Sequence, residues 1–182
     1  LMSRICIEIV VRHAPGARDP FAEPHPWYVL IELSSQIEGD LDAKLEHSLG
    51  GAIEDGLVLD AVLATSLDQR LAFWALRESL SEMQGREGGS IKHDVSVPIA
   101  EIPALIEEAS AAAAKLIPGI RPVPFGHIGD GNIHFNFSQP VDWDKQAFLD
   151  RWHDLNEVVH AIVIRHGGSI SAEHGIGRLK RA

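Results

Sequence analysis

The stretch "GHIGDGNIHFNF", from Gly126 to Phe137, places two histidines seven residues apart across a glycine-rich segment. In a fully extended chain His127 and His134 would lie about 23 Å apart, at ~3.3 Å per residue. The residues between them, Gly-Asp-Gly-Asn, permit a tight reversal, because glycine adopts positive φ freely and Asp and Asn tolerate it. The stretch therefore predicts a turn that leads into a strand.

Beyond this turn the side chains alternate between apolar and polar. The apolar set, which is expected to face the core, is Ile133, Phe135 and Phe137. His134 and Asn136 then fall on the opposite face. Two histidines brought together over a sheet could share a metal ion, which needs each ligand atom within ~2.1 Å. A hairpin whose histidines are surface or satisfied core groups is an equally good interpretation of this stretch alone.

A second dense stretch, "SAEHGIG" from Ser171 to Gly177, carries Glu173 and His174. Glu173 would complete a His-His-Glu set, one of the ligand triplets of catalytic zinc sites. Adjacent residues of a regular strand face opposite ways, so both side chains serve one site only where the strand ends near Gly175. A glycine-containing turn with an exposed acid and imidazole is the alternative.

Periodicity in the rest of the chain predicts strands that alternate with helices. The expected strands are 27–33, 57–65, 90–98, the strand after the turn, and 169–175; the expected helices are 41–50, 66–84, 99–116 and 144–166. Residues 4–12 fit a helix or a strand, with the helix favoured. Two β-α-β-like halves predict an α+β fold: a ferredoxin-like antiparallel sheet with helices packed mainly on one face. Residues 1–26 are expected to form an N-terminal segment and proline-rich loop, and residues 27–182 the main domain.

Composition excludes some classes of function. The 182 residues carry a formal net charge of −10, which disfavours non-specific nucleic-acid binding but leaves room for a small anionic substrate beside local cations. Cys6 is the only cysteine, so a disulfide within the chain and a cysteine metal cluster are excluded, and a cytoplasmic location is expected. No apolar run approaches the ~20 residues of a membrane span. The abrupt ends of the sequence indicate a fragment of a longer protein.

Five motifs in order along the chain carry a family resemblance: "HPWYVLIEL", "WALRE", "KHDVSVP", "GHIGDGNIHFNFSQP" and "SAEHGIG". With them the chain resembles, over nearly its whole length, the C-terminal half of FAD-linked D-2-hydroxy-acid dehydrogenases of the vanillyl-alcohol oxidase superfamily. D-2-hydroxyglutarate and D-lactate dehydrogenases are of this type. The resemblance implies a substrate- and metal-binding cap domain. FAD would be bound mainly by an N-terminal domain that is absent here, since no dinucleotide fingerprint follows a strand.

The resemblance also implies roles for particular residues. A divalent metal, Zn or Mn, would be held by His127, His134 and Glu173; His174 would be the catalytic base; Arg77 and Lys92 would meet substrate carboxylates; Ser81 and Asn136 would contact substrate. Ser81 stands where the family commonly has threonine. From the residues alone, Arg77 and Ser81 share a face of the predicted helix and Lys92 points off the core side of its strand. Solvated charges are the alternative for both cations.

The expected function is therefore metal-assisted oxidation of a D-2-hydroxy acid to the 2-oxo acid, with hydride passing to FAD. The fragment is expected to be inactive alone. Two cations favour a dicarboxylate substrate such as 2-hydroxyglutarate, although one cation could serve lactate. A flavin-independent metal-dependent hydrolase and a non-catalytic hydroxy-acid-binding module are the alternatives. The sequence does not identify the electron acceptor, and a homodimer is compatible with it.

Overall fold

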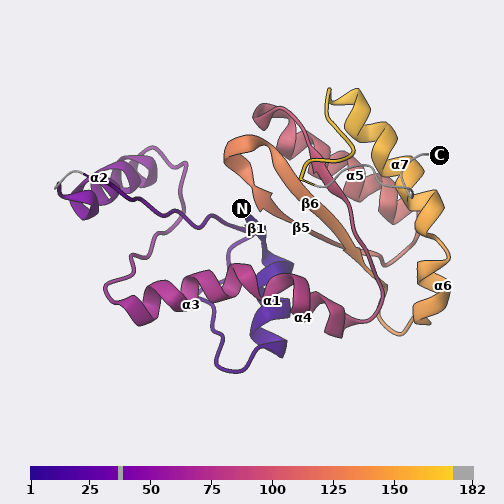
Figure 1. The fold of residues 1–182 in the computed structure, drawn as a ribbon, viewed down its shortest axis with the longest axis horizontal. Helices are drawn as coiled ribbons and strands as arrows, with labels where there is room; N and C mark the ends of the chain where they lie inside the picture. Colours follow the sequence, from indigo (N-terminus) through magenta and orange to yellow (C-terminus); the bar gives the residue numbers. More distant parts are fainter. Residues whose placement is uncertain (37–38, 174–182) are drawn as a thin grey trace.

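The computed structural model describes residues 1–36 and 39–173, and their core is an antiparallel sheet (Figure 1). Within these residues the strand order is β2-β1-β5-β6-β3, with β4 also paired to β6. The strands are β1 (Met2–Ser3), β2 (Trp27–Tyr28), β3 (Ser90–Ile91), β4 (Asp94–Ser96), β5 (Arg121–His127) and β6 (Asn132–Ser138). This arrangement confirms the predicted α+β class with an antiparallel sheet.

The reversal between β5 and β6 is confirmed as a hairpin. The 3₁₀ turn η3 (Ile128–Asp130) joins the strands, and Gly131 follows it with φ +76°. A Cβ on Gly131 would lie 2.1 Å from the Val97 carbonyl oxygen, so the position needs glycine for space as well as for conformation. The register pairs Phe125 with His134 and therefore places both on one face of the sheet.

One face of the sheet is covered by two long helices. α5 (Ile102–Leu116) and α7 (Trp152–Arg165) lie side by side there, with α6 (Lys145–Leu149) before α7 (Figure 1). The alternation of β6 turns Ile133, Phe135 and Phe137 into this core, where all three are fully buried. The predicted core face of the strand is therefore confirmed, and it leaves the other face of β6 to His134.

Helices also cover part of the opposite face. α1 (Arg4–His13) and α4 (Leu80–Gln84), with α3 (Leu67–Glu78) beside them, build a second core on Val123 and Phe125 of β5. α1 confirms the helix favoured for residues 4–12. The structure refines the expected one-sided arrangement, because Val123 and Phe125 of β5 give the second face of the sheet an apolar patch that needs a cover.

Three predicted elements near the start of the chain differ from the structure. α2 (Leu41–Glu54) runs through Gly50 and Gly51, where an end was predicted, and stops only before Gly56, whose φ is +71°. The expected strand 27–33 keeps only Trp27–Tyr28, and residues 57–65 form no strand. Their apolar side chains find no sheet partner among the described residues, and Leu57 is 80% exposed.

The later elements are shorter than the periodicity predicted. The helix expected over 66–84 is divided at Ser79 into α3 and α4, followed by η1 (Gly85–Glu87), and the helix expected over 144–166 is divided into α6 and α7. The 3₁₀ turn η2 (Ile99–Glu101) precedes α5, and residues 90–98 hold two short strands. The strand predicted over 169–175 is represented by one isolated bridge, between Ser169 and Ser96. Its last two residues, 174 and 175, lie outside the described residues. No helix in the described residues is long and apolar enough to cross a membrane.

Candidate active site

The sheet register gathers polar side chains on one face of its centre. Asp94 of β4 is paired with His134 of β6, which in turn is paired with Phe125 of β5. Ile91 pairs with Phe137 in the same register, so Lys92 falls opposite Asn136 on the face that carries His134. Three strands therefore place charged and aromatic groups around one imidazole.

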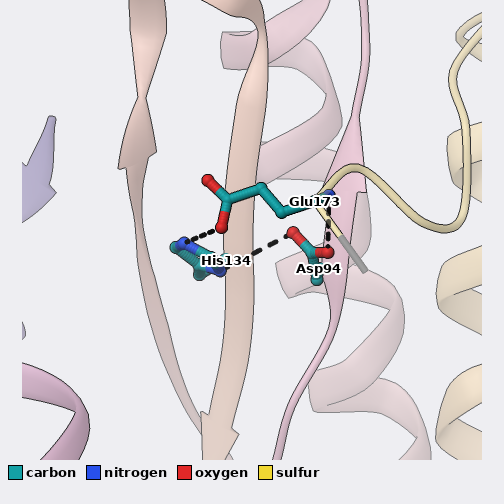
Figure 2. Close-up of side chains that lie close together, drawn as sticks. All are labelled: Asp94, His134 and Glu173. Atoms are coloured by element: carbon teal, nitrogen blue, oxygen red, sulfur yellow. Dashed lines mark hydrogen bonds and ion pairs between the residues drawn. The ribbon is translucent and has the colours of Figure 1, made fainter. Parts of the chain in front are cut away.

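A segment far along the chain brings a carboxylate to this face. After the bridge between Ser169 and Ser96, the chain passes β4, and the Glu173 backbone N–H donates to Asp94 Oδ2 at 2.9 Å. Glu173 extends over the strands toward the His134 ring, and Asp94 lies beside the ring (Figure 2). Glu173 Oε2 lies 3.9 Å from His134 Nε2, and Glu173 Oε1 lies 3.3 Å from His127 Nδ1.

The spacing of these donor atoms fits a divalent metal ion. Ligand atoms ~2.1 Å from one tetrahedral ion lie about 3.4 Å apart, close to both separations from the Glu173 carboxylate. The group whose ligand atoms all lie within 4.8 Å of one another consists of Asp94, His134 and Glu173. His127 is outside this group: it meets Glu173 at 3.3 Å, and its ring centroid is 6.5 Å from that of His134. Imidazole nitrogens with a carboxylate are a donor set for Zn or Mn.

The environment of His134 favours the form that binds metal. Burial lowers the pKa of His134 and outweighs the opposing attraction of the Glu173 and Asp94 carboxylates. A neutral imidazole keeps a lone pair on one ring nitrogen at neutral pH, which a metal requires. His127 is more exposed than His134, with 57% against 20% of the side chain accessible.

Arg77, in the last turn of α3, lies at the edge of the same group. Its guanidinium carbon is 4.9 Å from the centroid of the Phe125 ring, and Phe125 lies 4.9 Å from the His134 ring. Burial lowers the pKa of Arg77, while the Glu173 carboxylate favours its charged form. Arginine remains protonated even so, and its planar fork matches a carboxylate. The Phe125 ring therefore lies in contact with both the Arg77 guanidinium and the His134 imidazole.

The remaining predicted residues differ in their surroundings. Asn136 is buried; its Nδ2 donates to Gln84 Oε1 at 3.0 Å, and its Oδ1 accepts from the His93 backbone N–H at 3.3 Å. The amide thus ties α4 to the sheet beneath the site. Lys92 is exposed opposite Asn136, and Ser81 is exposed on α4, beyond the break in the helix that follows Arg77.

The structure brings together Arg77, His127, His134 and Glu173. His174, the predicted base, lies outside the described residues. Sequence reasoning missed Asp94 and Phe125 as members of the site. Alternation could have found both, because Asp94 follows Lys92 by two residues and Phe125 precedes His127 by two.

The described part of the chain is thus an α+β domain with an antiparallel sheet, one face of which carries a His-Glu cluster beside a half-buried arginine. The comparison with protein families is more specific. A model described as "FAD linked oxidases, C-terminal domain" matches residues 1–182, and the chain belongs to that family.

Curated relatives agree with this assignment. The chain is 38% identical over 165 residues to a D-2-hydroxyglutarate dehydrogenase of Stutzerimonas stutzeri, covering 89% of this chain and 34% of the relative. It is 37% identical over 176 residues to a D-2-hydroxyglutarate dehydrogenase of Xanthomonas citri pv. viticola, covering 97% of this chain and 36% of the relative. A mitochondrial D-2-hydroxyglutarate dehydrogenase of Arabidopsis thaliana is 34% identical over 174 residues, and the match covers 96% of this chain and 30% of the relative. The chain spans about a third of the length of these relatives.

Proposed function

We propose that this chain is the substrate- and metal-binding domain of an FAD-dependent dehydrogenase that oxidises D-2-hydroxy acids to 2-oxo acids. D-2-hydroxyglutarate is the first substrate to test, because the relatives above carry that name. The observation that carries the proposal is the Glu173 carboxylate, which faces both His127 and His134 close to the half-buried Arg77. Such a group can hold a metal ion and a carboxylate substrate at once.

His127, His134 and Glu173 would hold the ion, through Nδ1 of His127, Nε2 of His134 and the carboxylate. When bound, Zn or Mn would supply Lewis acidity that lowers the pKa of the substrate hydroxyl. Arg77 would fix the substrate carboxylate, and Phe125 would hold the guanidinium beside His134. Orientation of this kind places the C–H bond of the hydroxy carbon for transfer.

Lys92 is the candidate partner for a second carboxylate. It lies on the same face of the sheet as His134, opposite Asn136 in the register of β6. Asn136 retains one amide N–H beyond its bond to Gln84, and Ser81 offers a hydroxyl from α4. Two cations on one face favour a dicarboxylate over lactate, whose single carboxylate needs only one.

His174 would take the hydroxyl proton, since it directly follows Glu173 and imidazole titrates near working pH. FAD, which the family name implies, would accept the hydride and would be bound mainly by sequence beyond these 182 residues. We therefore expect no oxidation by the chain alone. Oxidation of a 2-hydroxy acid to the 2-oxo acid removes two hydrogens. The hydroxyl hydrogen would leave as a proton to His174, and the hydrogen on the hydroxy carbon would leave as a hydride to the flavin.

Calorimetric titration of the chelator-stripped chain with Zn and with Mn tests the metal site. Stoichiometric binding that is lost in His134→Ala and kept in His153→Ala, an exposed histidine of α7, supports the proposal. Equal affinity in native chain and His134→Ala contradicts it. The second arm adds D-2-hydroxyglutarate or D-lactate to the loaded chain, beside Arg77→Gln and Lys92→Gln. We expect both variants to weaken binding of the dicarboxylate, and only Arg77→Gln to weaken binding of lactate.

The longer protein tests the reaction itself. Bleaching of its flavin by D-2-hydroxyglutarate, abolished by a chelator and restored by metal, is the expected result. Hydrolysis of esters or amides by this chain without flavin would instead support a metal-dependent hydrolase. Binding of hydroxy acids with neither activity would identify a non-catalytic binding module.

A further inference from the structure

We infer that Asp94 is a positioning residue for the metal-binding group: it keeps the proton of His134 on Nδ1, so that Nε2 is free for the ion, and it anchors the backbone of Glu173. The inference rests on the metal site of the proposed function. Asp94 belongs to β4 and has 12% of its side chain accessible, so it is held more firmly than Glu173, at 42%.

The two nitrogens of His134 face different carboxylates. Nδ1 lies 3.7 Å from Asp94 Oδ1, whereas Nε2 lies 3.9 Å from Glu173 Oε2 (Figure 2). A neutral imidazole has one protonated nitrogen and one lone pair, and an ion takes the lone pair. Because Glu173 Oε1 also meets His127, the ion belongs on the Nε2 side. The proton then belongs on Nδ1, on the side of Asp94 Oδ1; at 3.7 Å this pair is in ion-pair range, and a small approach of the two side chains would complete the carboxylate–histidine–metal arrangement.

The same carboxylate anchors the segment that delivers Glu173. Asp94 Oδ2 accepts from the Glu173 backbone N–H at 2.9 Å, and the Asp94 backbone carbonyl accepts from the Ala172 N–H at 3.3 Å. Asn132 Nδ2 donates to Asp94 Oδ1 at 3.3 Å. Asp94 therefore connects β4, the start of β6 and residues 172–173. Losing its carboxylate would release both His134 and Glu173.

Asp94 is placed beside the ion rather than on it. Its Oδ2 is engaged by the Glu173 backbone and its Oδ1 by Asn132. It also lies on the Nδ1 side of His134, and the two nitrogens of an imidazole point away from each other. Ligand atoms of Asp94 lie within 4.8 Å of those of His134 and Glu173, so Asp94 as a third ligand is the alternative that unchanged Co(II) bands would exclude.

Asparagine at this position makes a sharp test, because it has one oxygen. If that oxygen keeps the bond from the Glu173 N–H, the amide N–H₂ points at His134 Nδ1 and at Asn132 Nδ2. A donor facing Nδ1 moves the imidazole proton to Nε2, which is the nitrogen that the ion needs. We therefore expect Asp94→Asn to reverse the His134 tautomer, whereas Asp94→Ala yields a mixture of the two.

The experiment measures the tautomer by ¹⁵N–¹H imidazole correlations in the metal-free chain, at a pH where His134 is neutral. The native chain is expected to show protonated Nδ1, Asp94→Asn to show protonated Nε2, and Asp42→Asn, in exposed α2, to match the native chain. The same tautomer in native chain and Asp94→Asn overturns the inference. Since no metal is present, this result stands whether or not the proposed metal site is correct.

Metal binding supplies the second readout. Zn affinity of Asp94→Asn and Asp94→Ala is expected to fall about 10–100-fold, the usual effect of losing a partner behind a metal-bound histidine. The Co(II) absorption bands at saturation are expected to match those of the native chain, because the ligands are unchanged. Unaltered affinity overturns the inference. So does a loss as large as that of His134→Ala accompanied by altered Co(II) bands, which would make Asp94 a ligand itself.

Discussion

The guanidinium of Arg77 lies over the face of the Phe125 ring, with 4.9 Å between the guanidinium carbon and the ring centroid. Phe125 also lies beside His134, with 4.9 Å between the two ring centroids. Phe125 thus sets the spacing between the cation that would bind a carboxylate and the imidazole that would bind the metal. Its role is geometric and electrostatic, since a cation over an aromatic face is stabilised by the ring quadrupole.

Replacing Phe125 by leucine is expected to weaken binding of D-2-hydroxyglutarate about tenfold, because the guanidinium loses its aromatic support, worth about 0.5–2 kcal/mol. Calorimetry on the metal-loaded chain measures the change. Phe137→Leu is the matched control, since Phe137 is equally buried but belongs to the core on the opposite face. Similar losses of affinity in both variants would show that Phe125 acts only through stability.

Gly131 and Gly129 belong to the same turn but meet different surroundings. A Cβ on Gly131 would lie 2.1 Å from the Val97 carbonyl oxygen and would require φ +76°, whereas a Cβ on Gly129 meets nothing within 4 Å. We expect Gly131→Ala to lower the free energy of unfolding by about 2–4 kcal/mol and Gly129→Ala to change it by less than about 1 kcal/mol. Urea unfolding measures both. Equal stability of the two variants would contradict the tight turn.

The parts of the fold that the sequence predicts correctly are local. Glycine at the turn and strict alternation after it place Ile133 in the core and His134 on the other face without any knowledge of the partner strands. The His127 and His134 pair follows from the same reversal, because antiparallel strands return the chain to its starting edge. Glu173 could be nominated only by its chemistry and by the family resemblance, since 39 residues separate it from His134.

The parts that were mispredicted depend on tertiary partners. Residues 57–65 are rich in strand-forming side chains, yet Leu59 stays 72% exposed and no strand pairs with the segment among the described residues. α2 continues through Gly50 and Gly51 because glycine within a helix costs only about 1 kcal/mol, and the positive φ that ends it falls at Gly56. Alternation puts Asp94 on the same face as Lys92, but its place directly opposite His134 depends on the register of two strands, which one strand alone does not specify.

A second charged cluster, away from the candidate site, predicts acid sensitivity. Glu87, with 7% of its side chain accessible, accepts hydrogen bonds from Arg121, His13 and Arg12. Burial opposes its ionisation, but these three partners lower the pKa of Glu87 from its ordinary 4.5 to about 2. A carboxyl group whose pKa is lower in the folded than in the unfolded chain stabilises the fold at pH values above its unfolded-state pKa. That stabilisation is lost as the pH falls through the folded-state pKa.

We therefore expect Glu87→Gln to lower the free energy of unfolding by about 1–3 kcal/mol at neutral pH, the usual range for hydrogen bonds to a charged group. The difference from the native chain should shrink between pH 4.5 and about 2, as the native Glu87 takes up a proton. Urea unfolding across this range measures it, with Glu157→Gln, at an exposed position of α7, as the control. A difference that stays constant with pH would exclude the ionised form of Glu87 as its source.

His166, at the end of α7, predicts the opposite pH dependence. Its Nδ1 lies 2.8 Å from Glu101 Oε2 and its Nε2 lies 2.9 Å from Glu108 Oε2, so the imidazole connects α7 to η2 and α5. Only a protonated ring donates at both nitrogens. Hydrogen bonds to Glu101 and then Glu108 raise the pKa of His166 above its ordinary 6.5.

A histidine whose pKa is higher in the folded than in the unfolded chain stabilises the fold fully at pH values below its unfolded-state pKa. This stabilisation is lost as the pH rises through the folded-state pKa. His166→Gln is therefore expected to have a lower urea midpoint than the native chain at about pH 5.5, and the gap should narrow by about pH 8.5. His153→Gln, an exposed histidine of the same helix, is the control and should show no such narrowing. An equal difference in urea midpoint at both pH values would mean that His166 stabilises the fold by packing and not through its charge.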